Sequence, residues 1–148
     1  DAAVGHFMGY VDRASLIVVS LKDVPVAVMN FVEGTRFRPE KHKNQKSPYK
    51  HLLRPKAGGI AFVLSAMGDH LSSILDVTIS YAPSATGLWY FMCGRVSTVR
   101  VRIRQIPINN EIRGDYFDDP DFRHRFQEWV NRLWENKDRT LTVLRSEG

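Results

Sequence analysis

Residues 24–36 read VPVAVMNFVEGTR, a nearly continuous apolar run that ends at a charged turn. The valine-rich part, Val24–Phe31, is broken only by Asn30, and such runs are typical of strands that are buried on both faces. Glu33 and Gly34 end the run, because glycine readily adopts the backbone angles of a tight turn. We therefore expect a buried strand that delivers the side chains of residues 33–36 to one sharp bend.

The composition fits a single globular domain. The chain has 148 residues, of which 43% are hydrophobic and 25% charged, and this excludes a disordered or fibrous protein. Its single cysteine, Cys93, excludes an internal disulfide framework and a cysteine-based zinc site, and favours a reducing compartment. No apolar run approaches the roughly 18 residues of a membrane span. We expect no signal peptide, since no basic residue precedes Arg13, and the missing initiator Met leads us to expect a piece of a longer protein.

The positive charge is concentrated in one segment. The net charge is +5, and residues 36–56 hold eight basic residues against one acid, so the rest of the chain is slightly acidic. A local positive field attracts phosphorylated small molecules, anionic lipid headgroups or nucleic acid. The alternative is a solvated loop whose lysines only aid solubility. With Pro39 and Pro48 and no apolar period, we expect a long loop here.

Three further segments carry helix or strand patterns. We expect a helix from Pro55 to Gly68, a strand over Leu75–Tyr81 and another over Leu88–Cys93. The adjacent glycines at 58 and 59 disfavour a helix, so we expect close packing on a neighbouring backbone or a ligand there.

Two amphipathic segments follow. Residues 99–104 alternate valine or isoleucine with arginine, which predicts a strand with one buried apolar face and one wet face. Asp119 and Pro120 then begin a helix. We expect the aromatic face of the helix to pack on the core, with a membrane-surface helix as the alternative. We expect the three arginines of the strand to face solvent, with contact to anionic lipid or RNA as the alternative. The apolar positions of this helix are Phe122, Phe126, Trp129, Val130 and Leu133.

The sequence contains no complete catalytic or metal-binding motif. No glycine-rich phosphate loop, nucleophile elbow or zinc signature occurs, and the five histidines show no metal-ligand spacing, so we identify no catalytic residue and no metal site. The bend has the chemistry to hold a phosphate monoester. Arg36 can make two parallel bonds, Thr35 and the backbone after Gly34 can donate more, and Glu33 can orient Arg36 or accept from a hydroxyl. The alternative is that Glu33 and Arg36 only pair with each other.

Residues 31–36, Phe-Val-Glu-Gly-Thr-Arg, resemble the Phe-Pro-Glu-Gly-Thr-Arg motif of the glycerophospholipid (1-acylglycerol-3-phosphate) acyltransferase family. The similarity runs from about Val24 to the C-terminus and is strongest for the YihG-like branch. It implies that residues 24–148 are the C-terminal part of a layered α/β acyltransferase domain, with a mixed sheet and flanking helices, after an unassigned leader over residues 1–23. The supporting blocks are Glu40–Lys43, His51–Ala61, Gly114–Tyr116 and Phe122–Leu141.

The resemblance implies phospholipid biosynthesis or remodelling at the cytoplasmic face of the inner membrane. An acyl group would move from acyl-CoA or acyl carrier protein to a lysophospholipid, with no other cofactor. Glu33, Gly34, Thr35 and Arg36 would bind the glycerol phosphate of the acceptor. Arg54 and Lys56 are candidate secondary anion contacts. The implied partners are the lysophospholipid, the acyl thioester and an anionic membrane surface, and no specific nucleic acid is expected.

The general base of that family, a His-x-x-x-x-Asp motif, is absent from this chain. His70 and Asp76 are one residue too far apart to replace it. We therefore expect the chain alone to bind anionic headgroups weakly and to transfer no acyl group. Two alternatives stay open: a nucleic-acid-binding module built on residues 36–56, and an inactive acyltransferase fragment. A truncated sheet would also expose an unpaired edge and an apolar face.

Overall fold

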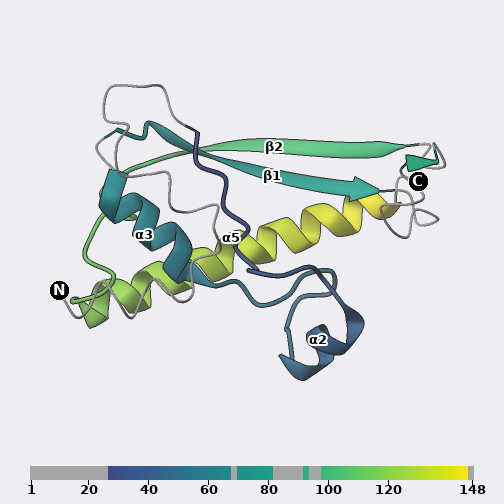
Figure 1. Ribbon diagram of the computed structural model, residues 1–148, viewed down its shortest axis with the longest axis horizontal. Coiled ribbons are helices and arrows are strands. Elements are labelled where there is room, and N and C mark those ends of the chain that lie inside the picture. Colours follow the sequence, from purple (N-terminus) through teal and green to yellow (C-terminus); the bar gives the residue numbers. More distant parts are fainter. Residues whose placement is uncertain (1–26, 68–69, 82–91, 94–97, 147–148) are drawn as a thin grey trace.

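The computed structural model describes residues 27–67, 70–81, 92–93 and 98–146. Helix α5 runs beneath a two-stranded sheet, α3 packs against α5 at one end, and α2 lies on the far side of α5 from the sheet (Figure 1). The protein is thus mixed α/β, as predicted. Its elements in chain order are α2 (Pro39–Asn44), α3 (Ala57–Met67), β1 (Ser73–Tyr81), β2 (Val99–Pro107) and α5 (Pro120–Ser146).

Helix α5 begins where the sequence predicts and carries the core. The Asp119 carboxylate accepts hydrogen bonds from the backbone N–H groups of Asp121 at 2.9 Å and Phe122 at 3.0 Å, which is an N-cap. The predicted core packing of its apolar face is confirmed, although Trp129 is only partly buried. The residues of the main core cluster are Ala57, Ala61, Leu64, Ile112, Phe122, Phe126 and Val130, and a smaller cluster contains Tyr49, Leu133 and Trp134.

The predicted helix over residues 55–68 is α3, which begins two residues after Pro55. Gly68, the expected end of this helix, lies outside the described residues. A Cβ atom added at Gly59 would lie 2.9 Å from Nδ2 of Asn30, whereas one at Gly58 would meet no atom within 4 Å. The close packing predicted for the two glycines is therefore found at Gly59.

Strands β1 and β2 pair antiparallel, with Val77 opposite Ile103. Both strands were predicted, but the described part of the chain forms a two-stranded antiparallel sheet instead of a mixed one. The prediction that the apolar face of β2 is buried is wrong. The polar face of the sheet is the covered one, since Thr78 is only 5% exposed beneath α5. The open apolar face consists of Leu75, Val77, Ile79, Tyr81, Val99, Val101 and Ile103, each 43% to 62% exposed.

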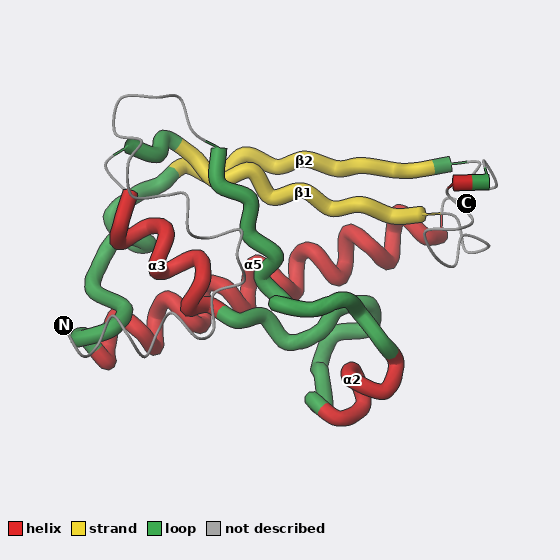
Figure 2. The backbone as a smooth tube through the Cα atoms, in the orientation of Figure 1, coloured by secondary structure: helices red, strands yellow, loops and turns green. Residues whose placement is uncertain are grey.

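The buried strand predicted for Val24–Phe31 is wrong over residues 27–31. This segment is loop, as the backbone tube in Figure 2 shows, and Met29 and Phe31 are 81% and 78% exposed. A strand that is buried on both faces needs neighbouring strands, and within the described ranges β1 and β2 pair only with each other. Residues 24–26 lie outside the described part of the chain.

The long loop predicted for residues 36–56 is interrupted by the short helix α2. Pro39 stands in the first turn of this helix, where a missing N–H costs no hydrogen bond.

Most of the strand predicted for Leu88–Cys93 lies outside the described residues, and Met92 and Cys93 are not extended. Over the residues that the structure describes, no helix combines the length and the hydropathy of a membrane span.

Candidate functional site

The bend at Gly34 is formed as the sequence predicts. The Gly34 N–H donates to the Phe31 carbonyl at 2.8 Å, and the Gly34 φ of +67° lies in the left-handed region that favours glycine. The side chain of Lys56 runs past this glycine. A Cβ at Gly34 would lie 3.5 Å from both Cδ and Nζ of Lys56, so the Lys56 ammonium lies at the bend.

Two hydrogen bonds fasten the bend to the 53–56 segment. The Glu33 carboxylate accepts from the Leu53 N–H at 3.0 Å, and the Lys56 N–H donates to the Val32 carbonyl at 2.8 Å. Leu53 is fully buried, which anchors the segment in the protein. Among the described residues, Glu33 and Arg36 form no ion pair, so the alternative in which they only bind each other is not what the structure shows.

The Glu33 carboxyl group is half-buried, and burial raises its pKa above the ordinary value. The Leu53 N–H, the Trp134 indole and the Lys137 ammonium oppose this rise. The indole N–H of Trp134 acts on Glu33 as a hydrogen-bond donor, although among the described residues the buried Nε1 has no hydrogen bond of ordinary geometry. Glu33 is therefore an inward-facing group that positions the bend.

Cationic side chains also lie at the bend. Thr35 Oγ1 accepts a hydrogen bond from Lys41 Nζ at 2.5 Å, which brings an ammonium from α2 to the bend. Arg36 is exposed and makes no hydrogen bond or ion pair with another described residue. Lys56 lies beside Gly34 and Lys41 beside Thr35, and Arg36 follows directly in the sequence; we call Arg36, Lys41 and Lys56 the cationic cluster.

Lys56 was expected from the sequence as an anion contact, whereas Lys41 was not. The available signal was the block Glu40–Lys43, which directly follows the bend. This block lies on the short helix α2, and the residue at which that helix begins decides which lysine side chain reaches Thr35. The other secondary candidate, Arg54, takes a different role. Its Nη2 donates to the Lys46 carbonyl at 3.0 Å, and its side chain lines a pocket against α5.

Two of the described histidines, His42 and His51, form hydrogen bonds with other parts of the fold. The His42 Nε2 donates to the Tyr49 carbonyl at 2.6 Å. The His51 ring lies between Thr142 and Arg145 of α5. Among the described residues, no group of three or more His, Cys, Asp or Glu side chains has the arrangement of a metal site.

Comparison with known proteins gives distant relatives. The chain is 26% identical over 132 residues to an uncharacterized acyltransferase of Schizosaccharomyces pombe, covering 80% of this chain and 35% of the relative. It is 23% identical over 135 residues to the 1-acyl-sn-glycerol-3-phosphate acyltransferase delta of Mus musculus and of Rattus norvegicus, covering 82% of this chain and 33% of each relative. No protein-family model and no solved structure matches the chain.

The chain thus spans about a third of the length of the curated relatives that it matches. At this level of identity, it is a distant homologue of acyltransferases, including a 1-acyl-sn-glycerol-3-phosphate acyltransferase.

Proposed function

We propose that this chain is the acceptor-binding part of an acyltransferase that moves an acyl group from acyl-CoA or acyl carrier protein to a lysophospholipid of the 1-acylglycerol-3-phosphate type. The homology to acyltransferases supports the reaction class. The observation that carries the acceptor assignment is the exposed Arg36 next to a bend at which Lys41 and Lys56 also lie. This charge suits a phosphate monoester, which carries about −1.5 to −2 at neutral pH.

Each group at the bend has a distinct part in binding the phosphate. Arg36 supplies a planar fork that can donate two parallel bonds to phosphate oxygens, whereas Lys56 supplies a point charge. The Thr35 hydroxyl accepts from Lys41, which leaves its own O–H free to donate to the ligand. Glu33 acts through the Leu53 N–H, by holding the bend in place.

We assign residues 24–148 to the C-terminal part of a YihG-like domain, and we assign the complete protein to the cytoplasmic face of the inner membrane. The sequence blocks that resemble that branch support both assignments. Because the chain lacks a His-x-x-x-x-Asp base, the complete protein would take its base from another segment. We expect no acyl transfer from oleoyl-CoA to lysophosphatidic acid by this chain alone, which a thiol-release assay measures.

The acceptor site is tested by titrating the 148-residue chain with glycerol 3-phosphate and following backbone amide shifts. Arg36→Gln should weaken binding by about 30-fold, which corresponds to roughly 2 kcal/mol for a lost charged hydrogen-bonding group. Arg38→Gln is the matched control, since it removes the same charge from an exposed side chain two residues away. We expect it to change affinity less than about threefold by weaker, screened electrostatics.

Equal losses in Arg36→Gln and Arg38→Gln would overturn the site and leave only a diffuse positive field. The nucleic-acid alternative is tested by comparing two ligands. Salt-sensitive binding to a single-stranded oligonucleotide, together with no binding to vesicles that contain lysophosphatidic acid, would favour that alternative over an acyltransferase.

A further inference from the structure

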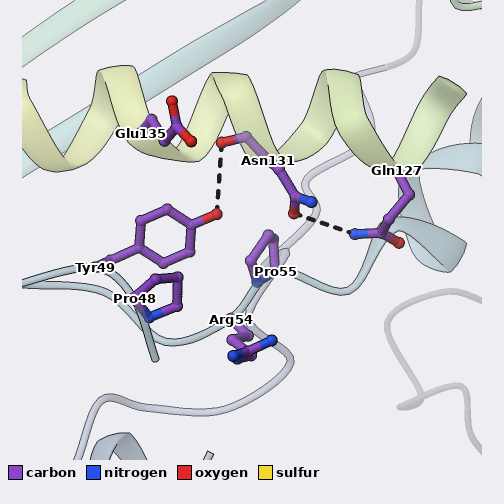
Figure 3. A pocket seen from close by; sticks show the side chains of 7 residues that line it. All are labelled: Pro48, Tyr49, Arg54, Pro55, Gln127, Asn131 and Glu135. Atoms are coloured by element: carbon purple, nitrogen blue, oxygen red, sulfur yellow. Dashed lines mark hydrogen bonds between the residues drawn. The ribbon is translucent and has the colours of Figure 1, made fainter. Parts of the chain in front are cut away.

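A pocket of about 400 Å³ lies between the 48–55 segment and α5 (Figure 3). This volume is in the lower part of the range of small-molecule sites. The pocket is separate from the proposed phosphate contacts, since Arg36, Lys41 and Lys56 do not line it. Its lining residues are Pro48, Tyr49, Arg54, Pro55, Gln127, Asn131 and Glu135.

The walls of this pocket are fixed by contacts with α5. The Asp138 carboxylate accepts hydrogen bonds from the Lys50 N–H at 2.9 Å and the His51 N–H at 2.7 Å, and so fastens the loop to the helix. Tyr49 is 7% exposed, and its hydroxyl lies 3.5 Å from the Asn131 carbonyl oxygen, to which it donates. The pocket is therefore largely formed before any ligand arrives, which lowers the entropic cost of binding.

The pocket has opposite charges on opposite sides. Figure 3 shows Arg54 on one side and Glu135 on the other, with the rings of Tyr49, Pro48 and Pro55 between them. Burial raises the pKa of the Tyr49 phenol most strongly, Glu135 raises it further and Arg54 lowers it, so both charges act on the same ring.

The contacts that Arg54 and Glu135 already make leave both side chains able to bind a ligand. Arg54 uses Nε and Nη2 on the Lys46 carbonyl, at 3.4 Å and 3.0 Å, which orients the guanidinium and leaves Nη1 outside that contact. Glu135 is exposed, and its Oε2 lies 3.7 Å from Arg139 on the next turn of α5. Exposed pairs of this length contribute about 0.5 kcal/mol or less, so a ligand ammonium can compete with Arg139 for Glu135.

We propose that this pocket binds a small zwitterion, with its anionic group on Arg54, its ammonium on Glu135 and its short linker over the two prolines. The proposal goes beyond the phosphate-binding function and does not depend on it. Two sources share this chemistry: the headgroup of an ethanolamine phospholipid and a free amino acid.

The experiment titrates the 148-residue chain with four probes and follows the backbone amides of Tyr49 and Asn131. Glycerophosphoethanolamine and 4-aminobutyrate represent the two zwitterionic sources, while glycerol 3-phosphate and ethanolamine each carry one of the charges. We expect at least one zwitterion to bind about tenfold more tightly at this pocket than either probe that carries charge of one sign only. The tighter zwitterion identifies the source.

Variants of α5 provide the matched comparison. Glu135→Gln should reduce zwitterion affinity about tenfold, whereas Glu128→Gln, which alters a carboxylate of the same helix that pairs with His124 and does not line the pocket, should leave it unchanged. Arg139→Gln should leave affinity unchanged or raise it, because it removes the competitor for Glu135. All three residues are exposed, so the variants are expected to fold.

The proposal is overturned if no zwitterion binds more tightly at the pocket than the two probes of one charge sign, or if Glu135→Gln and Glu128→Gln behave alike. Its failure is distinguishable from failure of the phosphate site. Glycerol 3-phosphate binding that depends on Arg36 would persist in the first case, and zwitterion binding that depends on Glu135 would persist in the second.

Discussion

The Lys137 ammonium lies 2.6 Å from the Asp76 carboxylate, and this pair joins α5 to the covered polar face of the sheet. Both side chains are largely buried, with exposed fractions of 11% and 9%. Lys137 also donates to the Val77 carbonyl at 2.7 Å, and Arg104 lies 3.1 Å from the other Asp76 oxygen. The helix is therefore held to the sheet by a partly buried ionic network, in addition to the packing of Ile74 and Ile106 on the core clusters.

Removing the lysine should destabilise the protein strongly. Lys137→Ala leaves the Asp76 carboxylate with Arg104 alone, and breaking such a buried pair costs about 3 kcal/mol or more. Arg139→Ala, two residues further on, removes only an exposed pair with Glu135 and should cost less than about 1 kcal/mol. Urea unfolding measures both losses, and comparable values for the two variants would contradict the importance of the network.

The inward-facing Glu33 should make stability depend on pH. Because folding raises its pKa from 4.5, the folded state holds this proton more tightly than the unfolded state. Its contribution to stability is therefore full below pH 4.5 and is lost as pH rises through the folded pKa. Glu33→Gln keeps an oxygen for the Leu53 N–H and removes the titration, so the variant should gain stability relative to the native chain as pH rises.

Unfolding free energies of both proteins between about pH 4 and about pH 7 measure this difference. A difference between the two proteins that stays constant across that range would contradict the assignment of Glu33.

The contribution of His51 to stability should depend on pH in the opposite direction to that of Glu33. An arginine can only donate, so the 2.8 Å contact from Arg145 makes Nδ1 an acceptor and leaves the ring proton on Nε2, 3.2 Å from Thr142 Oγ1. Burial and Arg145 both lower the pKa of His51 below 6.5. The neutral ring therefore contributes stability that is present above pH 6.5 and is lost as pH falls through the lower folded pKa.

Arg145→Gln should raise the pKa of His51, because the nearby positive charge is gone. A proton NMR titration of the imidazole measures the change. An unaltered midpoint in the variant would show that the Arg145 contact does not control this histidine.

The two glycines of α3 should respond differently to alanine. Gly58→Ala enters open space and should stabilise the protein by roughly 0.5 kcal/mol through helix propensity and a less flexible unfolded chain. Gly59→Ala gains the same propensity, but its Cβ would lie 2.9 Å from the Asn30 side chain, which has to turn away. We expect a smaller gain or a small loss, measured by thermal unfolding. Equal gains at both positions would show that the Asn30 contact costs nothing.

Local sequence patterns predicted α3, α5, β1 and β2, but they missed α2, predicted a strand where residues 27–31 form a loop, and assigned one sheet face wrongly. Asp119 and the apolar spacing after it predicted α5, and the alternation at Val101 and Ile103 predicted β2. The same alternation gave the wrong buried face, because α5 covers the polar side through Lys137. Which side a helix covers depends on contacts between residues some 60 positions apart, and no local period contains that information.

The candidate site was likewise predictable from the sequence only in part. The bend at Gly34 was predictable because a glycine after an apolar run is a local signal. The contact between Glu33 and the Leu53 N–H spans 20 residues, and the contact between Lys41 and Thr35 depends on where α2 begins. Both required the folded chain, and the contact with Leu53 shows that Glu33 also positions the bend.

The open apolar side of β1 and β2 bears on how this chain will behave in the laboratory. Seven large side chains there, among them Ile103 at 62% exposure, meet water over two adjacent strands. Contiguous patches of this kind promote self-association. We expect the purified chain to form soluble oligomers as its concentration rises, and a mild non-ionic detergent to return it to monomers. Threonine at positions 101 and 103 should have the same effect as the detergent while preserving the strand, since threonine is also β-branched.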